Sequence, residues 1–129
     1  MPIYIKQNDD GTANIVDIGT GSSVLTVDSS TGDVTVPTGN LKITTAGKGL
    51  QIETGAVTDR LGTSTLVAGT VTVANTSAVT ADKLFLSRAT TGGTTGHLSY
   101  TLSSGTSFTI NSTSNTDTST INWLLVKGL

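Results

Sequence analysis

The residues that could perform catalysis are few, and the first is the single histidine, His97. It lies in the stretch TTGHL, which the pattern predicts to be a loop-to-strand junction. A Ser-His-Asp arrangement would have to use this residue. The sequence has no Gly-x-Ser-x-Gly motif, and its 14 serines place some serine near His97 by chance alone. We therefore interpret His97 as a surface or edge-strand residue, with catalysis as the less favoured alternative.

Carboxylates offer a second chemistry, the acid–base pair of a glycosidase. Glu53 is the only glutamate, so such a pair would need some of the eight aspartates. Turn formation is the simpler role for aspartates that lie beside or near Gly, Ser or Thr, namely Asp28, Asp33, Asp59, Asp82 and Asp117. We therefore expect a protein that is not an enzyme, with a depolymerase as the alternative.

Two loops, and the numbers of cysteine and histidine residues, indicate which ligands the chain could bind. The stretch NDDG at 8–11 could be a calcium-loop fragment, but a hairpin turn explains the same letters. The stretch TGGTTG at 91–96 lacks the Gly-Lys-Ser/Thr ending of a phosphate loop and is typical of a flexible strand connection. Zero cysteines and one histidine exclude zinc, iron–sulfur and disulfide frameworks. We expect no cofactor, no metal and no small-molecule substrate.

Composition narrows the class further. Of 129 residues, 27 are Thr and 14 are Ser, whereas charged residues make up only 12%, about half the usual share. A net charge of −2 argues against nucleic acid, and no apolar run approaches the roughly 18 residues of a membrane helix. Leu, Ile, Val and Phe reach 33 residues, enough for a core, and they alternate with Thr and Ser. This alternation predicts strands.

Hairpins are predicted for the first part of the chain. Strands at 23–27 and 33–36 flank a turn, and Pro37 ends the second. A second pair is predicted at 41–43 and 50–52. Gly55-Ala56 then marks a boundary between an N-terminal hairpin region, 1–56, and a C-terminal module, 57–129.

The C-terminal module is predicted to be an antiparallel, jelly-roll-like β-sandwich of five or six strands. In KLFLSR at 83–88, Leu84 and Leu86 share one face and Phe85 lies on the other. The run INWLLV at 121–126 suggests a central strand covered on both faces. Trp123 in this run is interpreted as a core anchor rather than an exposed platform for sugar. Further strands are predicted around 65–67, 71–74, 98–102 and 108–110.

The N-terminal region has few apolar residues for a core of its own. Tyr4 is its single aromatic residue, and isolated hairpins are marginal in water. We therefore expect these strands to bury their apolar faces against identical copies or a partner surface. The first ten residues lack a basic segment followed by an apolar one, so Sec export is not expected. A surface rich in hydroxyl groups and poor in Lys and Glu is, however, typical of proteins that work outside cells. A virion protein, assembled in the cytoplasm and released by lysis, fits both this composition and the absence of an export signal.

The C-terminal segment resembles a module of structural proteins of tailed bacteriophages. The resemblance is carried by GTSTLVAGTVTVANT at 62–76, LFLSR at 84–88, GTSFTI at 105–110 and TDTSTINW at 116–123. It implies a small β-sandwich that is commonly a homotrimer and occurs at fibre ends and in head-decorating proteins. The segments GNLKI at 39–43 and AGKGLQI at 46–52 resemble the connector before such modules.

Because only about 56 residues precede the module, the resemblance favours a small decoration (cement) protein on the outer surface of a phage head. Its expected partners are the other copies of the trimer and the major capsid protein. A trimer that contacts several capsid subunits at once can bind firmly even where each contact is weak. The alternative is a tail-fibre or head-fibre tip that binds a host receptor. Candidates for capsid contact are Ile3, Tyr4, Ile5, Ile15 and Ile18. Candidates for packing near the trimer axis are Leu41, Ile43, Leu50 and Ile52.

Overall fold

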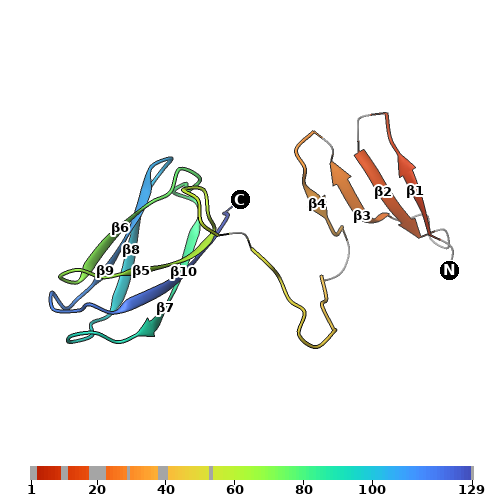
Figure 1. Cartoon of the computed structure of the whole chain (residues 1–129). Helices are drawn as coiled ribbons and strands as arrows, with labels where there is room; N and C mark the ends of the chain where they lie inside the picture. Colours follow the sequence, from red (N-terminus) through yellow and green to blue (C-terminus); the bar gives the residue numbers. More distant parts are fainter. Residues whose placement is uncertain are drawn as a thin grey trace. The chain divides into compact units, whose positions relative to one another are not determined.

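The fold is built of β-strands in two compact units, Met1–Leu50 and Gln51–Leu129 (Figure 1). The computed structural model describes residues 3–9, 12–17, 23–28, 30–37, 41–52 and 54–128. Its sheets are antiparallel, which confirms the predicted all-β class and the sandwich. Within these residues, no helix has the length and apolar character that crossing a membrane would require.

The first unit holds one four-stranded antiparallel sheet in the order β1-β2-β3-β4. The predicted hairpin between 23–27 and 33–36 is confirmed, because β3 pairs with β4 in antiparallel register. Asp28 closes its turn by accepting the backbone N–H of Ser30 at 2.8 Å, and Gly32 supplies a φ of +77°. The strands are β1 (Ile3–Gln7), β2 (Thr12–Asp17), β3 (Ser23–Asp28) and β4 (Val34–Thr35).

The second predicted hairpin, at 41–43 and 50–52, is wrong. Residues 41–52 contain no strand, and a single turn hydrogen bond from the Lys48 N–H to the Thr45 carbonyl, 3.1 Å long, lies within them. The physical reason is that two three-residue segments gain little from pairing when no third strand or second layer covers them.

The second unit is a sandwich of two three-stranded sheets, in the orders β5-β10-β7 and β6-β9-β8. Consecutive strands β5 and β6 belong to different sheets, as do β7 and β8, so each of these connections crosses between the layers. The strands are β5 (Leu61–Thr65), β6 (Thr70–Ala74), β7 (Lys83–Thr90), β8 (Leu98–Ser103), β9 (Ser107–Ser112) and β10 (Thr120–Val126).

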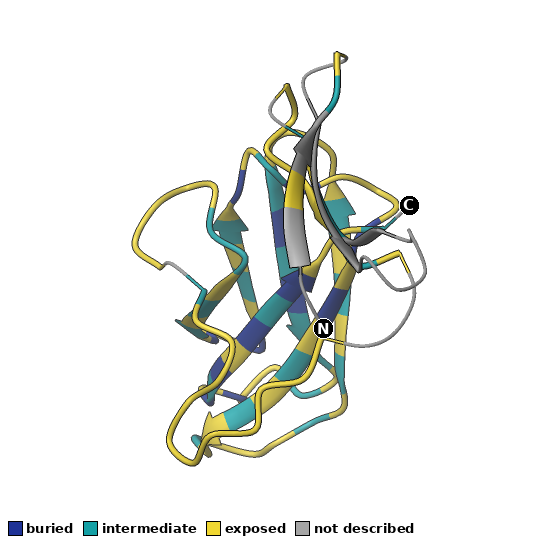
Figure 2. Ribbon diagram, turned by 90° about the vertical axis from the view of Figure 1, so that its right-hand side faces the viewer, coloured by how far each residue is buried: buried dark blue, intermediate teal, exposed yellow. Residues whose placement is uncertain are grey.

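The core lies between these two sheets, and Figure 2 shows its buried positions as dark blue bands on the strands. At its centre, the rings of Phe108 and Trp123 meet edge to face with centroids 4.9 Å apart. Trp123 is only 6% exposed, which confirms the core interpretation over the sugar platform. The remaining core side chains are Leu66, Ala78, Leu84, Ile110, Ile121 and Leu125.

Strand β10 is central, as predicted, but only one of its faces is covered. Ile121, Trp123 and Leu125 are buried, whereas Asn122 and Val126 are exposed. The expectation of coverage on both faces is therefore wrong. An antiparallel sheet in a two-layer sandwich has one face open to solvent, even where its sequence is nearly continuous in apolar residues.

Candidate functional site

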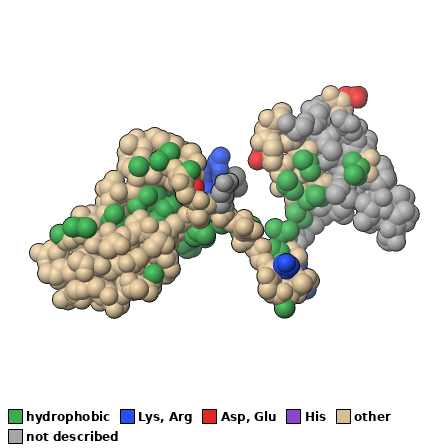
Figure 3. All heavy atoms as spheres, viewed as in Figure 1, with side chains coloured by type: hydrophobic (Ala, Val, Ile, Leu, Met, Phe, Trp, Pro, Cys, Tyr) green, Lys and Arg blue, Asp and Glu red, His purple; other side chains and the backbone are tan. Residues whose placement is uncertain are grey.

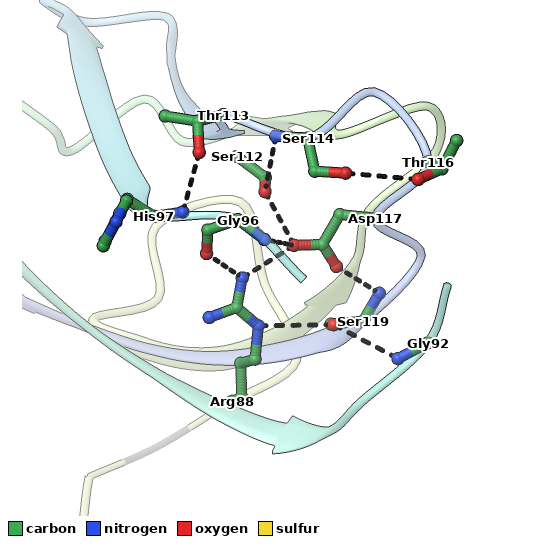
Figure 4. Close-up of polar contacts among 10 residues, drawn as sticks. All are labelled: Arg88, Gly92, Gly96, His97, Ser112, Thr113, Ser114, Thr116, Asp117 and Ser119. Atoms are coloured by element: carbon green, nitrogen blue, oxygen red, sulfur yellow. Dashed lines mark hydrogen bonds and ion pairs between the residues drawn. The ribbon is translucent and has the colours of Figure 1, made fainter. Parts of the chain in front are cut away.

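The most connected polar group of the sandwich is the carboxylate of Asp117, which is fully buried (Figure 4). Arg88 on β7 donates to its Oδ2 from Nη2 at 2.6 Å, and the Ser112 hydroxyl on β9 donates at 2.7 Å. The backbone N–H groups of Gly96 and Ser119 donate at 3.1 and 3.0 Å. The carboxylate thus joins both sheets to the loops around it, and we call these five residues the Asp117 network.

This network fixes the protonation state of Asp117. Hydrogen bonds with Ser119 and Ser112 outweigh desolvation and, with Arg88, hold the pKa of the carboxyl well below its usual range. A carboxylate with so low a pKa is a poor proton acceptor. The geometry is that of a structural ion pair.

The glycine-rich loop at 91–96 is fastened by the same network. Gly92 accepts a 2.9 Å hydrogen bond from the Thr118 N–H and donates its own N–H to the Ser119 hydroxyl at 3.2 Å. A Cβ at Gly93, whose φ is +63°, would collide with the Thr116 carbonyl. The loop predicted as a flexible connection is therefore a tightly packed cover over the buried carboxylate.

His97 lies next to this network without joining it through its ring. Its backbone N–H donates to the Thr113 hydroxyl at 2.9 Å, while the imidazole points away from Asp117 (Figure 4). The side chain is exposed. The structure therefore does not bring His97, Asp117 and Ser112 into a Ser-His-Asp relay, in agreement with the surface interpretation.

A second buried carboxylate, Asp82, pairs with Arg60 at 2.7 Å. Burial raises the pKa of Asp82, but hydrogen bonds from the N–H of Gly128, from Arg60 and from the N–H of Val79 outweigh it, so the pKa lies below its ordinary value. The turn interpretation of Asp82 and Asp117 is thus incomplete. Each does bond to nearby backbone, yet both are buried and ion-paired, unlike Asp28.

The signal that could have identified these pairs is the scarcity of arginine. The chain has two arginines, Arg60 and Arg88, and each is paired with one of the buried aspartates. In a sequence with 12% charged residues, an arginine inside a strand rich in Leu and Phe is more easily explained by a buried partner than by solvent.

The outer face of sheet β5-β10-β7 carries a different arrangement. Leu124 on the central strand is registered with Leu61 on β5 and Phe85 on β7, and we call these three side chains the apolar row. Phe85 is 61% exposed and Leu61 is 36% exposed. The sequence predicted that Phe85 lies on the other face of the strand from Leu84 and Leu86, and the structure confirms this prediction.

The next outward register along the same strands is polar. Asn122 on β10 is paired with Thr63 on β5 and Ser87 on β7, and these three form the polar row. The Thr63 hydroxyl donates to Asn122 Oδ1 at 3.1 Å. Among the described residues, Asn122 Nδ2 and the Ser87 hydroxyl have no protein partner, so both can hydrogen-bond to a ligand.

Two hollows adjoin these rows. A cavity of about 200 Å³ is lined by all three side chains of the apolar row and by Asn122 and Ser87 of the polar row. A larger one of about 640 Å³ is lined by Asp59, Thr54 and Thr63 among others. The two share Leu61, Asn122 and Trp123 as lining residues, so they lie next to each other along strand β10.

Gly62 shapes the larger cavity because it faces Trp123 across the β5–β10 ladder. A Cβ at this position would collide with the six-membered ring of the Trp123 indole. We expect Gly62→Ala to displace the indole and to lower the free energy of unfolding by about 1–3 kcal/mol, the usual cost of overpacking. Urea denaturation followed by Trp123 fluorescence measures the change.

Gly49→Ala is the control for that substitution, since a Cβ at Gly49 meets nothing within 4 Å. It should leave the unfolding free energy within about 0.5 kcal/mol of the wild-type value. Equal midpoints for the Gly62 variant and the wild type would show that the indole is not held against this strand.

The predicted capsid-contact residues lie in or next to the first sheet. Ile5 on β1 is registered with Ile15 on β2, Tyr4 with Val16 and Ile3 with Asp17. The side chain of Ile5 is 74% exposed. Ile18 lies outside the described residues.

The predicted trimer-packing residues lie in the strandless segment 41–52. Leu41 and Leu50 are 76% and 75% exposed, Ile43 is 46% exposed and Ile52 is half-buried. Figure 3 shows hydrophobic side chains on the surface of this segment beside lysines. In the single chain, most of the surface of the Leu41 and Leu50 side chains is therefore open to solvent.

The stretch 8–11, predicted to be a hairpin turn with a calcium-loop fragment as the alternative, lies partly outside the described residues, because Asp10 and Gly11 are not described. Glu53, the single glutamate, is not described either. Across the part of the chain that the structure covers, no group of three or more His, Cys, Asp and Glu side chains gathers in a way that could hold a metal ion.

Comparison with known proteins gives one family. Residues 12–126 match the K1 capsule-specific polysaccharide lyase, C-terminal domain, and so span both units. No curated protein and no solved structure matches the chain. The match supports a bacteriophage structural protein with a β-sandwich, and it does not single out a head decoration protein. The chain belongs to the family of the K1 capsule-specific polysaccharide lyase C-terminal domain.

Proposed function

We propose that this chain is an adhesion module of a phage tail spike or tail fibre, and that it holds no catalytic site of its own. The observation that carries the proposal is the family match over residues 12–126, because the matched domain is the C-terminal part of an enzyme directed at a capsule polysaccharide. A fold can serve many functions, so the assignment rests on the family and not on the sandwich alone.

The polar chemistry of the sandwich supports a structural role. Asp82 and Asp117 are both saturated by hydrogen bonds and paired with arginines. Groups held in this way define loop positions and are unsuited to proton transfer. We therefore assign the binding function to the solvent-facing sides of the sheets.

The proposal is tested by locating the protein on purified virions. Gold-labelled antibody against the chain should mark tail spikes or fibres in electron micrographs, and quantitative mass spectrometry should give few copies per particle. Gold on the head shell, with copies in proportion to the capsid protein, would reject the tail assignment.

A second candidate, the head decoration protein, is favoured by the first sheet. Its strands carry exposed apolar side chains, with Ile5 on β1 74% exposed and Val34 on β4 61% exposed. Exposed apolar side chains of this kind suit contact with a capsid shell as well as with sister copies. The same labelling experiment separates the two candidates.

We further propose that the chain acts as a homotrimer, in which the segment 41–52 packs near the axis. The support is the exposure of Leu41 and Leu50 in the single chain. Burying a leucine side chain contributes about 1.5–3 kcal/mol of stabilisation. Association that buries Leu41 and Leu50 of each copy against the other copies is therefore favourable.

Light scattering after size-exclusion chromatography should give a mass three times the 13.1 kDa of one chain. The double variant Leu41→Asp/Leu50→Asp should dissociate to the single-chain mass, because charged side chains cannot be buried cheaply at an axis. Val67→Asp, at a 71% exposed position of the sandwich, is the control and should keep the larger mass. A wild-type protein that runs as a single chain would contradict the trimer.

A further inference from the structure

We infer that the outer edge of strand β8 is a contact between two copies of this chain, whose β8 strands pair in antiparallel orientation about a two-fold axis at Tyr100. The surface involved is a strand edge, whereas the proposed function uses the faces of the sheets. Two observations carry the inference. The edge is open in the single chain, and the sequence of β8 is complementary to itself.

Strand β8 ends the sheet β6-β9-β8, and among the described residues no strand pairs with its outer edge. The His97 carbonyl, one position before β8, accepts the Thr113 N–H at 3.0 Å, in line with the β8–β9 register. Hydrogen-bonded and non-hydrogen-bonded pairs alternate along an antiparallel ladder, so every second residue from His97 onward bonds to β9. The residues between them direct their N–H and carbonyl groups to the open edge, and these residues are Leu98, Tyr100 and Leu102.

The edge of β8 lacks the features that keep edge strands from pairing. Its six residues include no charged residue, no proline and no glycine, and its ladder with β9 has no register shift. The opposite edge of the same sheet is partly occupied, because Thr70 on β6 exchanges two backbone hydrogen bonds with Val67. In the other layer, edge strand β7 contains Lys83 and Arg88, and edge strand β5 contains Gly62. Of the four edge strands of the sandwich, β8 is thus the one best suited to accept a further strand.

The sequence of β8 selects a second copy of the same strand as the partner. Residues 98–102 read Leu-Ser-Tyr-Thr-Leu, an order of apolar and hydroxyl-bearing residues that is the same in both directions. An antiparallel pair centred on Tyr100 therefore places each leucine opposite a leucine and each Ser opposite a Thr. In this register the open N–H and carbonyl groups of the two edges face each other, and each facing pair of residues exchanges two hydrogen bonds.

Both faces of the paired strands gain from this register. On the inner face, Leu98, Tyr100 and Leu102 are only half-buried although they pack against the core, and a second β8 strand covers them further. On the outer face, hydroxyl groups come to lie side by side. The sheet already contains such a pair, because the Oγ1 atoms of Thr72 and Thr109 on neighbouring strands are 2.9 Å apart.

The symmetry and size of the contact define what it joins. A two-fold contact uses the same edge of both copies, so it cannot by itself close three copies into a ring. In trimers held by segment 41–52 it links a chain of one trimer to a chain of another. One strand edge buries less than the roughly 800 Å² on each side of a stable interface. We therefore expect the trimer mass at low protein concentration and a rising mass as the concentration increases.

The test uses the full chain, which has no cysteine of its own. Ser99→Cys and Thr101→Cys, both at exposed positions, are prepared separately and mixed under oxidising conditions. In the inferred pair these two positions face each other without backbone hydrogen bonds, with Cα atoms about 4.5 Å apart, a distance that a disulfide can bridge. The same position in the two copies lies on a diagonal of about 7–8 Å. The mixture should therefore form a disulfide-linked dimer, twice the 13.1 kDa of one chain, about tenfold faster than either variant alone.

A mixture of Ser99→Cys with Thr72→Cys is the control, because Thr72 is exposed on the other edge strand of the same sheet. It should form a dimer no faster than the single variants, and unchanged Trp123 fluorescence shows that each variant is folded. Equal rates in the two mixtures would overturn the inference, as would a single variant that reacts as fast as the Ser99→Cys/Thr101→Cys mixture. A wild-type mass by light scattering that stays constant as the concentration is raised would also overturn it.

Discussion

Phe108→Ala is expected to lower the free energy of unfolding of the sandwich by about 3–5 kcal/mol, the usual cost of truncating a buried aromatic residue. Phe108 is completely buried and packs edge to face against Trp123. The variant loses both the transfer free energy of the ring and the contact with the indole. Since small domains have a total stability of about 5–15 kcal/mol, much of the population should be unfolded at modest urea.

The chain offers a matched control for this substitution. Its other phenylalanine, Phe85, is 61% exposed on the outer face, so Phe85→Ala should change the unfolding free energy by about 0.5 kcal/mol or less. Trp123, the single tryptophan, lies in the sandwich core, so its fluorescence reports the unfolding of that unit. Similar urea midpoints for the two variants would show that the two sheets are not packed around Phe108.

The fold of the sandwich could be predicted because its signal is local. Alternation in KLFLSR at 83–88 places Leu84 and Leu86 inside and Phe85 outside, and the structure agrees. The period of two along a strand depends only on the backbone, so neighbouring residues suffice to find it. The apolar row could not be predicted in the same way, because it requires the register between β5, β10 and β7.

The errors have a common physical cause, which is that pairing and burial are decided by distant partners. Residues 41–43 and 50–52 have the pattern of strands, yet no strand among the described residues pairs with them. Asp82 and Asp117 have the neighbours of turn residues, and their burial is decided by Arg60 and Arg88, which are 22 and 29 positions away. Local sequence predicted their backbone bonds and missed their ion pairs.

The buried pairs also give the protein an expected acid sensitivity. The pKa values of Asp82 and Asp117 are lowered in the folded state, whereas an unfolded aspartate has a pKa of about 3.9. Below that pH the unfolded chain binds more protons than the folded chain, so the free energy of unfolding decreases as the pH is lowered. The urea midpoint should be nearly constant from about pH 8 to 5 and should decline steadily below about pH 4.

Asp117→Asn tests how much of that decline comes from the Asp117 network. At pH 7 the variant should unfold at a much lower urea concentration than the wild type, because Arg88 and the surrounding donors lose the charged acceptor that they share. The difference between the two midpoints should then shrink as the pH falls from 5 to 2, because the unfolded wild-type chain takes up a proton at Asp117 that the folded chain, with its lowered carboxyl pKa, does not bind. Asp33→Asn, at an exposed position, should follow the wild type throughout. A difference that stayed constant with pH would mean that Asp117 stabilises the fold by its shape alone and that its charge contributes nothing.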